Sequence, residues 1–158
     1  MEIKYFIMSI RYNKNSPEDF GLIPSKDEDI YIMPSDNSLW RKRNLYDFGW
    51  GKETGFYRIP LPKFNELINI MLDSCLNENK YGAASIILDD YIEELLNISL
   101  EILSVNTNID KYYDMFKILR LDEPINRSPI IGKNYNDILK DYEKWKYVSD
   151  QIKLREKR

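Results

Sequence analysis

The sequence contains no histidine in 158 residues and a single cysteine, Cys75. Histidine is the side chain whose pKa lies nearest neutrality, and it supplies the commonest general bases, nucleophile–base pairs and zinc ligands. A lone cysteine cannot form an intramolecular disulfide, which is typical of a reducing compartment. These absences exclude the histidine-based enzyme classes. The helical spacing around Cys75 predicts a buried core thiol.

Long apolar runs are also missing. No run approaches the roughly 20 residues that are needed to cross a bilayer, and the N-terminus lacks a secretory pattern. We therefore expect a cytoplasmic protein without membrane contacts. The length and the 43% hydrophobic content match one domain over residues 1–158. Within it we expect a loop-rich N-terminal lobe over 1–60 and a helical body over 61–158.

Helical periodicity is clear in the second part of the chain. Apolar residues recur every three or four positions over 64–76, 80–91, 92–103, 109–119 and from 134 to about 152. Leu72 and Leu139 lie on these apolar stripes, and we expect both to be buried. Pro124, Pro129 and Gly132 predict a loop of about a dozen residues before the last helix.

A turn is predicted where two acidic pairs bracket a Tyr-Ile dipeptide. Asp89 and Asp90 precede Tyr91, and Glu93 and Glu94 follow it after one residue. Carboxylates are favoured in the first turn of a helix, so the second pair indicates a new helix start. A continuous helix through this stretch is the alternative. We favour the turn.

The N-terminal part has a mixed pattern. Residues 3–12 are apolar on both faces, which fits a buried strand or a short helix, and residues 30–33 favour an extended conformation. Tyr46, Phe48 and Trp50 alternate with other residues, which places the aromatic side chains on one face. The expected fold class is mainly α (α+β). We expect an antiparallel helical bundle or a short α-solenoid-like body, with a small irregular β-containing N-terminal lobe.

Charge is distributed unevenly along the chain. Residues 61–110 carry nine acidic and two basic side chains, whereas residues 111–158 carry eight acidic and twelve basic ones. A surface built from the acidic segment would repel nucleic acid and attract a basic protein. We predict a partner-binding surface that contains the following residues: Asp89, Asp90, Tyr91, Glu93, Glu94 and Trp50. The carboxylates would steer the partner, and Tyr91 or Trp50 would anchor it.

Two other functions are compatible with the sequence. Asp89 and Glu93 lie one helical turn apart if the helix is continuous, and could hold a metal or act as acid and base in an enzyme. Residues 39–43 combine Trp40 with three basic side chains, as in a nucleic-acid-associated regulator that binds phosphates and stacks a base. Residues 49–55 lack the order of a phosphate-binding loop, and 27–29 lack the spacing of an EF-hand. We predict no catalytic residue, no cofactor and no metal.

One family resemblance is visible. The stretch YGAASIILDDYIEELL (81–96), preceded by LW (39–40) and YDFGW (46–50), resembles the small immunity proteins that neutralise bacterial polymorphic or contact-dependent toxins. The resemblance implies a cytosolic inhibitor that binds one cognate toxin, often a basic nuclease whose active site is covered by acidic residues of the inhibitor. These families share no diagnostic motif, so the resemblance transfers no functional residue.

Overall fold

The computed structural model describes residues 2–8, 16–46 and 52–156. Phe48 and Trp50, two of the predicted aromatic residues, lie outside this part of the chain. The described residues form five strands, five α-helices and a 3-10 helix, Pro17–Phe20. The chain divides into two compact units, 1–86 and 87–158, with the boundary inside the second α-helix. Each unit is considered by itself below.

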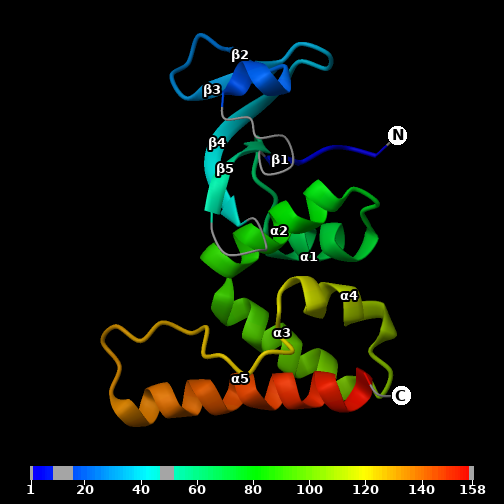
Figure 1. Cartoon of the computed structure of the whole chain (residues 1–158), viewed down its shortest axis with the longest axis vertical. Helices are drawn as coiled ribbons and strands as arrows, with labels where there is room; N and C mark the ends of the chain where they lie inside the picture. The colour runs from blue at the N-terminus through cyan, green and yellow to red at the C-terminus, as the bar shows by residue number, and fades with distance from the viewer. Residues whose placement is uncertain (1, 9–15, 47–51, 157–158) are drawn as a thin grey trace. The chain divides into compact units, whose positions relative to one another are not determined.

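The first unit is built on an antiparallel sheet (Figure 1). Its strands are β1 (Phe6–Met8), β2 (Ile23–Pro24), β3 (Ile30–Met33), β4 (Ser38–Tyr46) and β5 (Lys52–Arg58). Their order in the sheet is β1-β5-β4-β3-β2, and every pairing is antiparallel. The nine-residue β4 is the central strand, because it pairs with both β3 and β5.

This sheet contradicts the predicted fold class. A five-stranded antiparallel sheet is a substantial β component, so the expectation of a mainly α protein with a small irregular lobe is wrong. The misleading features are local. A glycine such as Gly55 is common in loops, yet here it lies within β5, where a Cβ would approach the Leu45 side chain to 2.6 Å and the Ile7 carbonyl to 2.8 Å. A strand glycine of this kind marks a close approach of neighbouring chains.

Two helices complete the first unit, α1 (Phe64–Asp73) and α2 (Asn77–Asp90), whose last turn lies beyond the unit boundary. The Asn79 side chain accepts the Tyr5 N–H and donates to the Ile3 carbonyl, both at 2.8 Å. The Glu78 carboxylate accepts the Met8 N–H at 2.9 Å. These side chains of α2 satisfy backbone groups of β1 and of the residues just before it.

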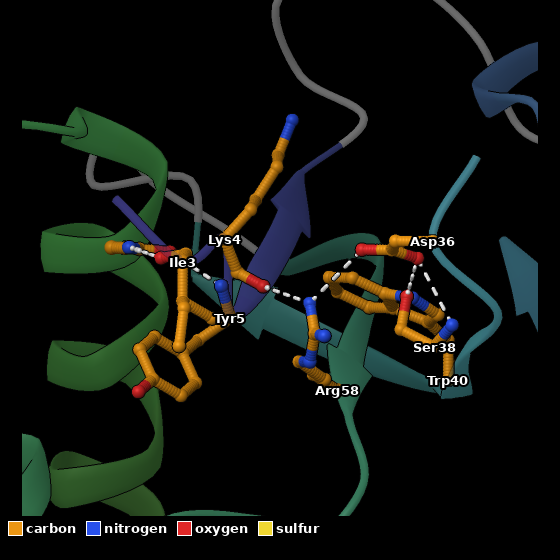
Figure 2. Close-up of polar contacts among 8 residues, drawn as sticks. Ile3, Lys4, Tyr5, Asp36, Ser38, Trp40 and Arg58 are labelled. Atoms are coloured by element: carbon orange, nitrogen blue, oxygen red, sulfur yellow. Dashed lines mark hydrogen bonds and ion pairs between the residues drawn. The ribbon is translucent and has the colours of Figure 1, made fainter. Parts of the chain in front are cut away.

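Trp40 is the centre of the sheet core. It is 1% exposed and clusters with Ile7, Leu22 and Phe56. Figure 2 shows the polar chain that surrounds it. The indole N–H donates to Ser38 Oγ at 2.7 Å, and that hydroxyl donates to an Asp36 oxygen at 2.5 Å. The same carboxylate pairs with Arg58 at 3.4 Å, and Arg58 also donates to the Lys4 carbonyl.

The second unit is helical. It contains the last turn of α2 together with α3 (Ile92–Val105), α4 (Asp110–Ile118) and α5 (Tyr135–Glu156). Residues 119–134 connect α4 to α5 without helix or strand, which confirms the predicted loop. Arg155 ties α5 to the C-terminal end of α3, because its guanidinium donates to the carbonyls of Leu103 and Asn106, both at 2.6 Å. A cation at this end of a helix is favoured by the macrodipole.

Three expectations about the helices are corrected. Helix α2 begins at Asn77, within the stretch that was expected to be a connection. Helix α1 ends at Asp73, because Ser74 turns to an extended conformation, and Cys75 beyond it is exposed rather than buried. Leu139 is 39% exposed, since the buried face of α5 begins at Trp145. Leu72, by contrast, is half-buried. Over the described residues, no helix has the length and apolar character needed to span a membrane.

Candidate functional site

The acidic corner, which we define as Asp89, Asp90, Glu93 and Glu94, lies where α2 meets α3. Helix α2 ends at Asp90 and α3 begins at Ile92, so the predicted turn is confirmed. Tyr91 has φ −133° and ψ 34°, donates its N–H to the Ile87 carbonyl at 2.9 Å and accepts the Leu95 N–H at 2.8 Å. A single residue therefore joins the two helices, and all four carboxylates are exposed.

The two halves of the acidic corner differ in their electrostatic setting. Glu93 and Glu94 lie in the first turn of α3, where the helix macrodipole stabilises negative charge. Asp89 and Asp90 lie in the last turn of α2, which contains no basic residue and where the macrodipole opposes negative charge. The dipoles of the two helices therefore act in opposite directions on the two pairs of carboxylates.

The structure separates several residues that the sequence grouped together. Tyr91 is half-buried within the corner, and Trp50 lies outside the described residues. Asp89 and Glu93 belong to different helices, so the continuous helix on which the metal or acid–base alternative depended is absent. In the part of the chain that the structure describes, no group of three or more acidic or cysteine side chains could hold a metal ion. Trp40 is buried and cannot stack on a base.

The acidic segment 61–110 is divided between the two units. Its first part belongs to the unit with the sheet, where Glu78 is half-buried between the Met8 N–H and the Lys4 ammonium, 3.3 Å away. Glu66 accepts the N–H of Lys63 at the start of α1 at 3.3 Å. These carboxylates support the fold. Among the exposed carboxylates of the segment, Glu66 and Asp73 belong to the first unit, whereas Glu101, Asp110 and the acidic corner belong to the second.

A feature that sequence reasoning missed is the order of the loop 119–134. Helix α4 ends in a Schellman motif, in which Arg120 at φ 58° donates to the Lys117 carbonyl and Leu121 donates to the Phe116 carbonyl, both at 3.0 Å. Arg127 then folds back on this end. Its guanidinium donates to the carbonyls of Arg120, Glu123 and Ile125.

A buried tryptophan holds the same loop from the side of α5. Trp145 is fully buried, its indole N–H donates to Ser128 Oγ at 2.9 Å, and the Arg127 guanidinium lies 5.3 Å from its ring centroid. Ser149 on the next turn donates to the Asp122 carbonyl at 2.8 Å. Burial lowers the pKa of Arg127, an effect that the carboxylates of Glu123 and Asp122 oppose. We call Arg127, Ser128 and Trp145 the loop brace.

Beyond the loop brace, large apolar side chains are exposed. We define the apolar tip as Ile130, Ile131, Tyr135 and Leu139, which are between 39% and 94% exposed. Gly132, at φ 78°, allows a turn in which the Lys133 N–H donates to the Ile130 carbonyl at 3.2 Å. The signal in the sequence was an Ile-Ile pair between Pro129 and Gly132, within a segment that was considered only as a connection.

An ion pair lies at the base of the apolar tip. Lys133 Nζ lies 2.5 Å from an Asp141 oxygen. The pKa of Lys133 is raised, chiefly by this hydrogen bond and by the charge of Asp141, with further contributions from Glu93 and Asp137 and against the effect of burial. Asp141 therefore neutralises Lys133 at the base of the apolar tip.

Comparison of the chain with protein-family models, curated proteins and solved structures gave no match in any of the three searches.

Proposed function

We propose that this chain is a non-enzymatic protein-binding module that acts in the cytosol and neutralises a cognate bacterial toxin by stoichiometric binding. The observation that carries the proposal is the acidic corner. Four exposed carboxylates are held on two helices that a single residue joins, and two of them oppose the dipole of their own helix. A basic surface that approaches this corner meets all four carboxylates together.

The proposed mechanism is electrostatic steering followed by close packing. Clustered charge of one sign raises the rate of encounter with a surface of opposite sign, and salt screens the effect. The helix ends fix the positions of the carboxylates, so little ordering is required on binding. A basic nuclease domain, the partner that the resemblance implies, has the surface charge that this mechanism requires.

The first test is capture followed by kinetics. The tagged full chain is used to isolate proteins from the native lysate, and the captured protein is then produced in purified form. Its association rate is measured at about 0.05 and 0.5 M salt, which span a large change in screening length. We expect a one-to-one complex in which the activity of the captured protein is lost. Reversing the acidic corner (Asp89→Lys, Asp90→Lys, Glu93→Lys, Glu94→Lys) should slow association about tenfold or more.

The control has the same change in net charge at other exposed positions of the second unit. It carries Glu101→Lys, Asp110→Lys, Asp114→Lys and Asp150→Lys, all at exposed side chains. A smaller effect of this control on the association rate would show that position matters beyond net charge. An association rate that neither salt nor reversal of the acidic corner changes would contradict the proposed mechanism.

A further inference from the structure

The sheet of the first unit has a second apolar face. Trp40 and Phe56 point into the core, so the residues that alternate with them along β4 and β5 point to the opposite face. Four aliphatic residues cross that face as cross-strand neighbours, and we call them the outer row: Ile23, Ile32, Leu39 and Ile59. The first three are paired in register, and the Leu39 carbonyl accepts the Ile59 N–H at 2.9 Å.

The outer row differs from a solvated sheet face. An antiparallel sheet that faces water on one side carries polar residues there, whereas strands that are apolar on both faces are typical of a sheet that is covered twice. Helix α2 covers the β1 end of this face, where a Cβ at Gly82 would approach the Phe6 ring to 2.1 Å. Ile23 and Leu39 remain 47% and 42% exposed. A further surface is therefore expected on the outer row.

Unpaired charges of both signs lie beside the outer row. A hollow of about 590 Å³ is lined by Glu28 and Asp29, from the turn before β3, and by Arg41, Lys42 and Arg43 of β4. Glu28, Asp29 and Arg41 are exposed, and none of them forms an ion pair within the part of the chain that the structure describes. A partner surface of one sign would be repelled by one half of this group. A surface that itself carries both signs is complementary to it.

A second copy of the chain provides such a surface. Two sheets that pack face to face keep their strands nearly aligned, and a two-fold axis makes the same patch meet itself. An axis parallel to the strands, midway between β3 and β4, exchanges the positions of the two strands. It places Ile32 of one copy on Leu39 of the other, because these residues are paired in register. Arg41, which is paired with Ile30, then lies beside Asp29 of the other copy.

We propose that the outer row is the contact surface of a homodimer. The row of each copy packs on the row of the other, and Arg41 of each copy pairs with Glu28 or Asp29 of the other. The proposal goes beyond the proposed function and does not depend on it, because the acidic corner belongs to the second unit.

The first test is sedimentation velocity of the full chain between about 1 and 100 μM, a range in which modest interfaces dissociate. We expect a dimer that dissociates on dilution. Leu39→Glu and Ile23→Glu should each raise the dissociation constant about tenfold or more, as for central residues of an interface. The matched control is Ile3→Glu, at a residue of the same unit that is 52% exposed and outside the outer row, and it should change the constant by less than about twofold.

A charge exchange tests the two-fold arrangement. Arg41→Glu places carboxylates opposite each other, and Glu28→Arg with Asp29→Asn leaves arginines facing each other, so each variant should weaken the dimer about tenfold. Asparagine is chosen because it tolerates the φ of 68° at Asp29. The variant with all three changes should dimerise within about threefold of the native chain, which a damaged sheet would not do. Circular dichroism should confirm that every variant is folded.

Several outcomes would overturn the proposal. They are a chain that stays monomeric at about 100 μM, a dimer that Leu39→Glu leaves intact, and a combined charge exchange that fails to restore dimerisation. Equal dissociation by Leu39→Glu and Ile3→Glu would also contradict it, because the effect would not depend on the outer row. A monomer that binds phosphatidylglycerol vesicles, and that Leu39→Glu prevents from binding, would identify a lipid surface as the occupant instead.

Discussion

Each unit buries a tryptophan whose indole N–H donates to a serine hydroxyl. The two units differ in how far apart the tryptophan and the serine are in the sequence. Trp40 donates its indole N–H to Ser38, two residues away, and Trp145 donates to Ser128, seventeen residues away. Both rings are almost completely buried, and both serine side chains are less than a tenth exposed. An indole N–H usually finds a partner when the ring is buried, so each serine satisfies a requirement of its core.

The two serines differ in the part of the structure that each one connects to its tryptophan. The Ser38 hydroxyl donates a hydrogen bond to Asp36, and Asp36 pairs with Arg58. The first network therefore links neighbouring strands of one sheet. Ser128 belongs to the loop 119–134, so the second network orders a segment that carries exposed apolar side chains. A tryptophan–serine pair therefore stabilises the core of the first unit, and another such pair holds an exposed loop in the second.

Replacing either tryptophan by alanine should have the largest effect. The loss of a fully buried indole is expected to reduce the free energy of unfolding by ~3–5 kcal/mol for Trp40→Ala and for Trp145→Ala. The two variants should differ in hydrogen exchange. Trp145→Ala should also accelerate exchange over residues 121–134, whereas Trp40→Ala should leave that loop protected. Equal exchange of the loop in both variants would contradict the role of Trp145 in the loop brace.

Replacing the two serines should have a smaller effect. Ser38→Ala and Ser128→Ala each leave a buried indole N–H without its partner, which is expected to cost about 1–3 kcal/mol of unfolding free energy. Only Ser128→Ala should also accelerate hydrogen exchange over residues 121–134, because it removes the bond that holds this loop to Trp145. Chemical denaturation and hydrogen exchange measure the two effects separately.

Ser99 offers the matched control for the serine pair. It is fully buried in α3, and among the described residues its Oγ has no hydrogen-bond partner. Ser99→Ala should therefore be neutral or stabilising, because it removes a buried hydroxyl that makes no bond. A loss of stability as large as that of Ser128→Ala would show that the cost comes from cavity formation rather than from the lost indole bond.

The sequence predicted the elements whose signals are local. Most helices follow apolar spacing, and the break at Tyr91 follows from the two acidic pairs around it. The sheet could not be recognised in this way, because the place of Gly55 in β5 depends on Leu45 and Ile7, which come from other strands. Strand pairing is set by such distant partners and by register.

The candidate site shows the same limit. The acidic corner is visible in the sequence because its charges are adjacent. The exposure of Leu139 and Ile131 is not, because it depends on where the buried face of α5 begins and on the loop brace. Arg127 resembles any surface cation in the sequence. Its function in the fold appears only when the carbonyls of Arg120, Glu123 and Ile125 converge on it.

The smallest expected effects concern how the free energy of unfolding depends on pH, and they differ between the two units. The Ser38 hydroxyl and then the Ser38 N–H lower the pKa of Asp36 in the first unit. In the second unit the hydrogen bond from Tyr113 to Glu156, at 2.7 Å, raises the pKa of the Tyr113 phenol.

A lowered carboxyl pKa adds stability above the unfolded value of about 3.9, and this is lost as the pH falls through the folded value. A raised phenol pKa adds stability below about 10, and this is lost as the pH rises through the folded value.

Urea unfolding across the pH range tests both signs. The stability advantage of the native chain over Asp36→Asn should be constant near neutral pH and should disappear in acid, below about pH 3. Its advantage over Tyr113→Phe should be constant up to about pH 9 and decline above that pH. The two variants thus serve as controls for each other, because each should be insensitive at the opposite end of the range. An advantage over Asp36→Asn that persists unchanged at about pH 2 would show that the hydrogen bonds from Ser38 do not depend on the charge of the carboxylate, and that the polar chain around Trp40 acts only through its geometry.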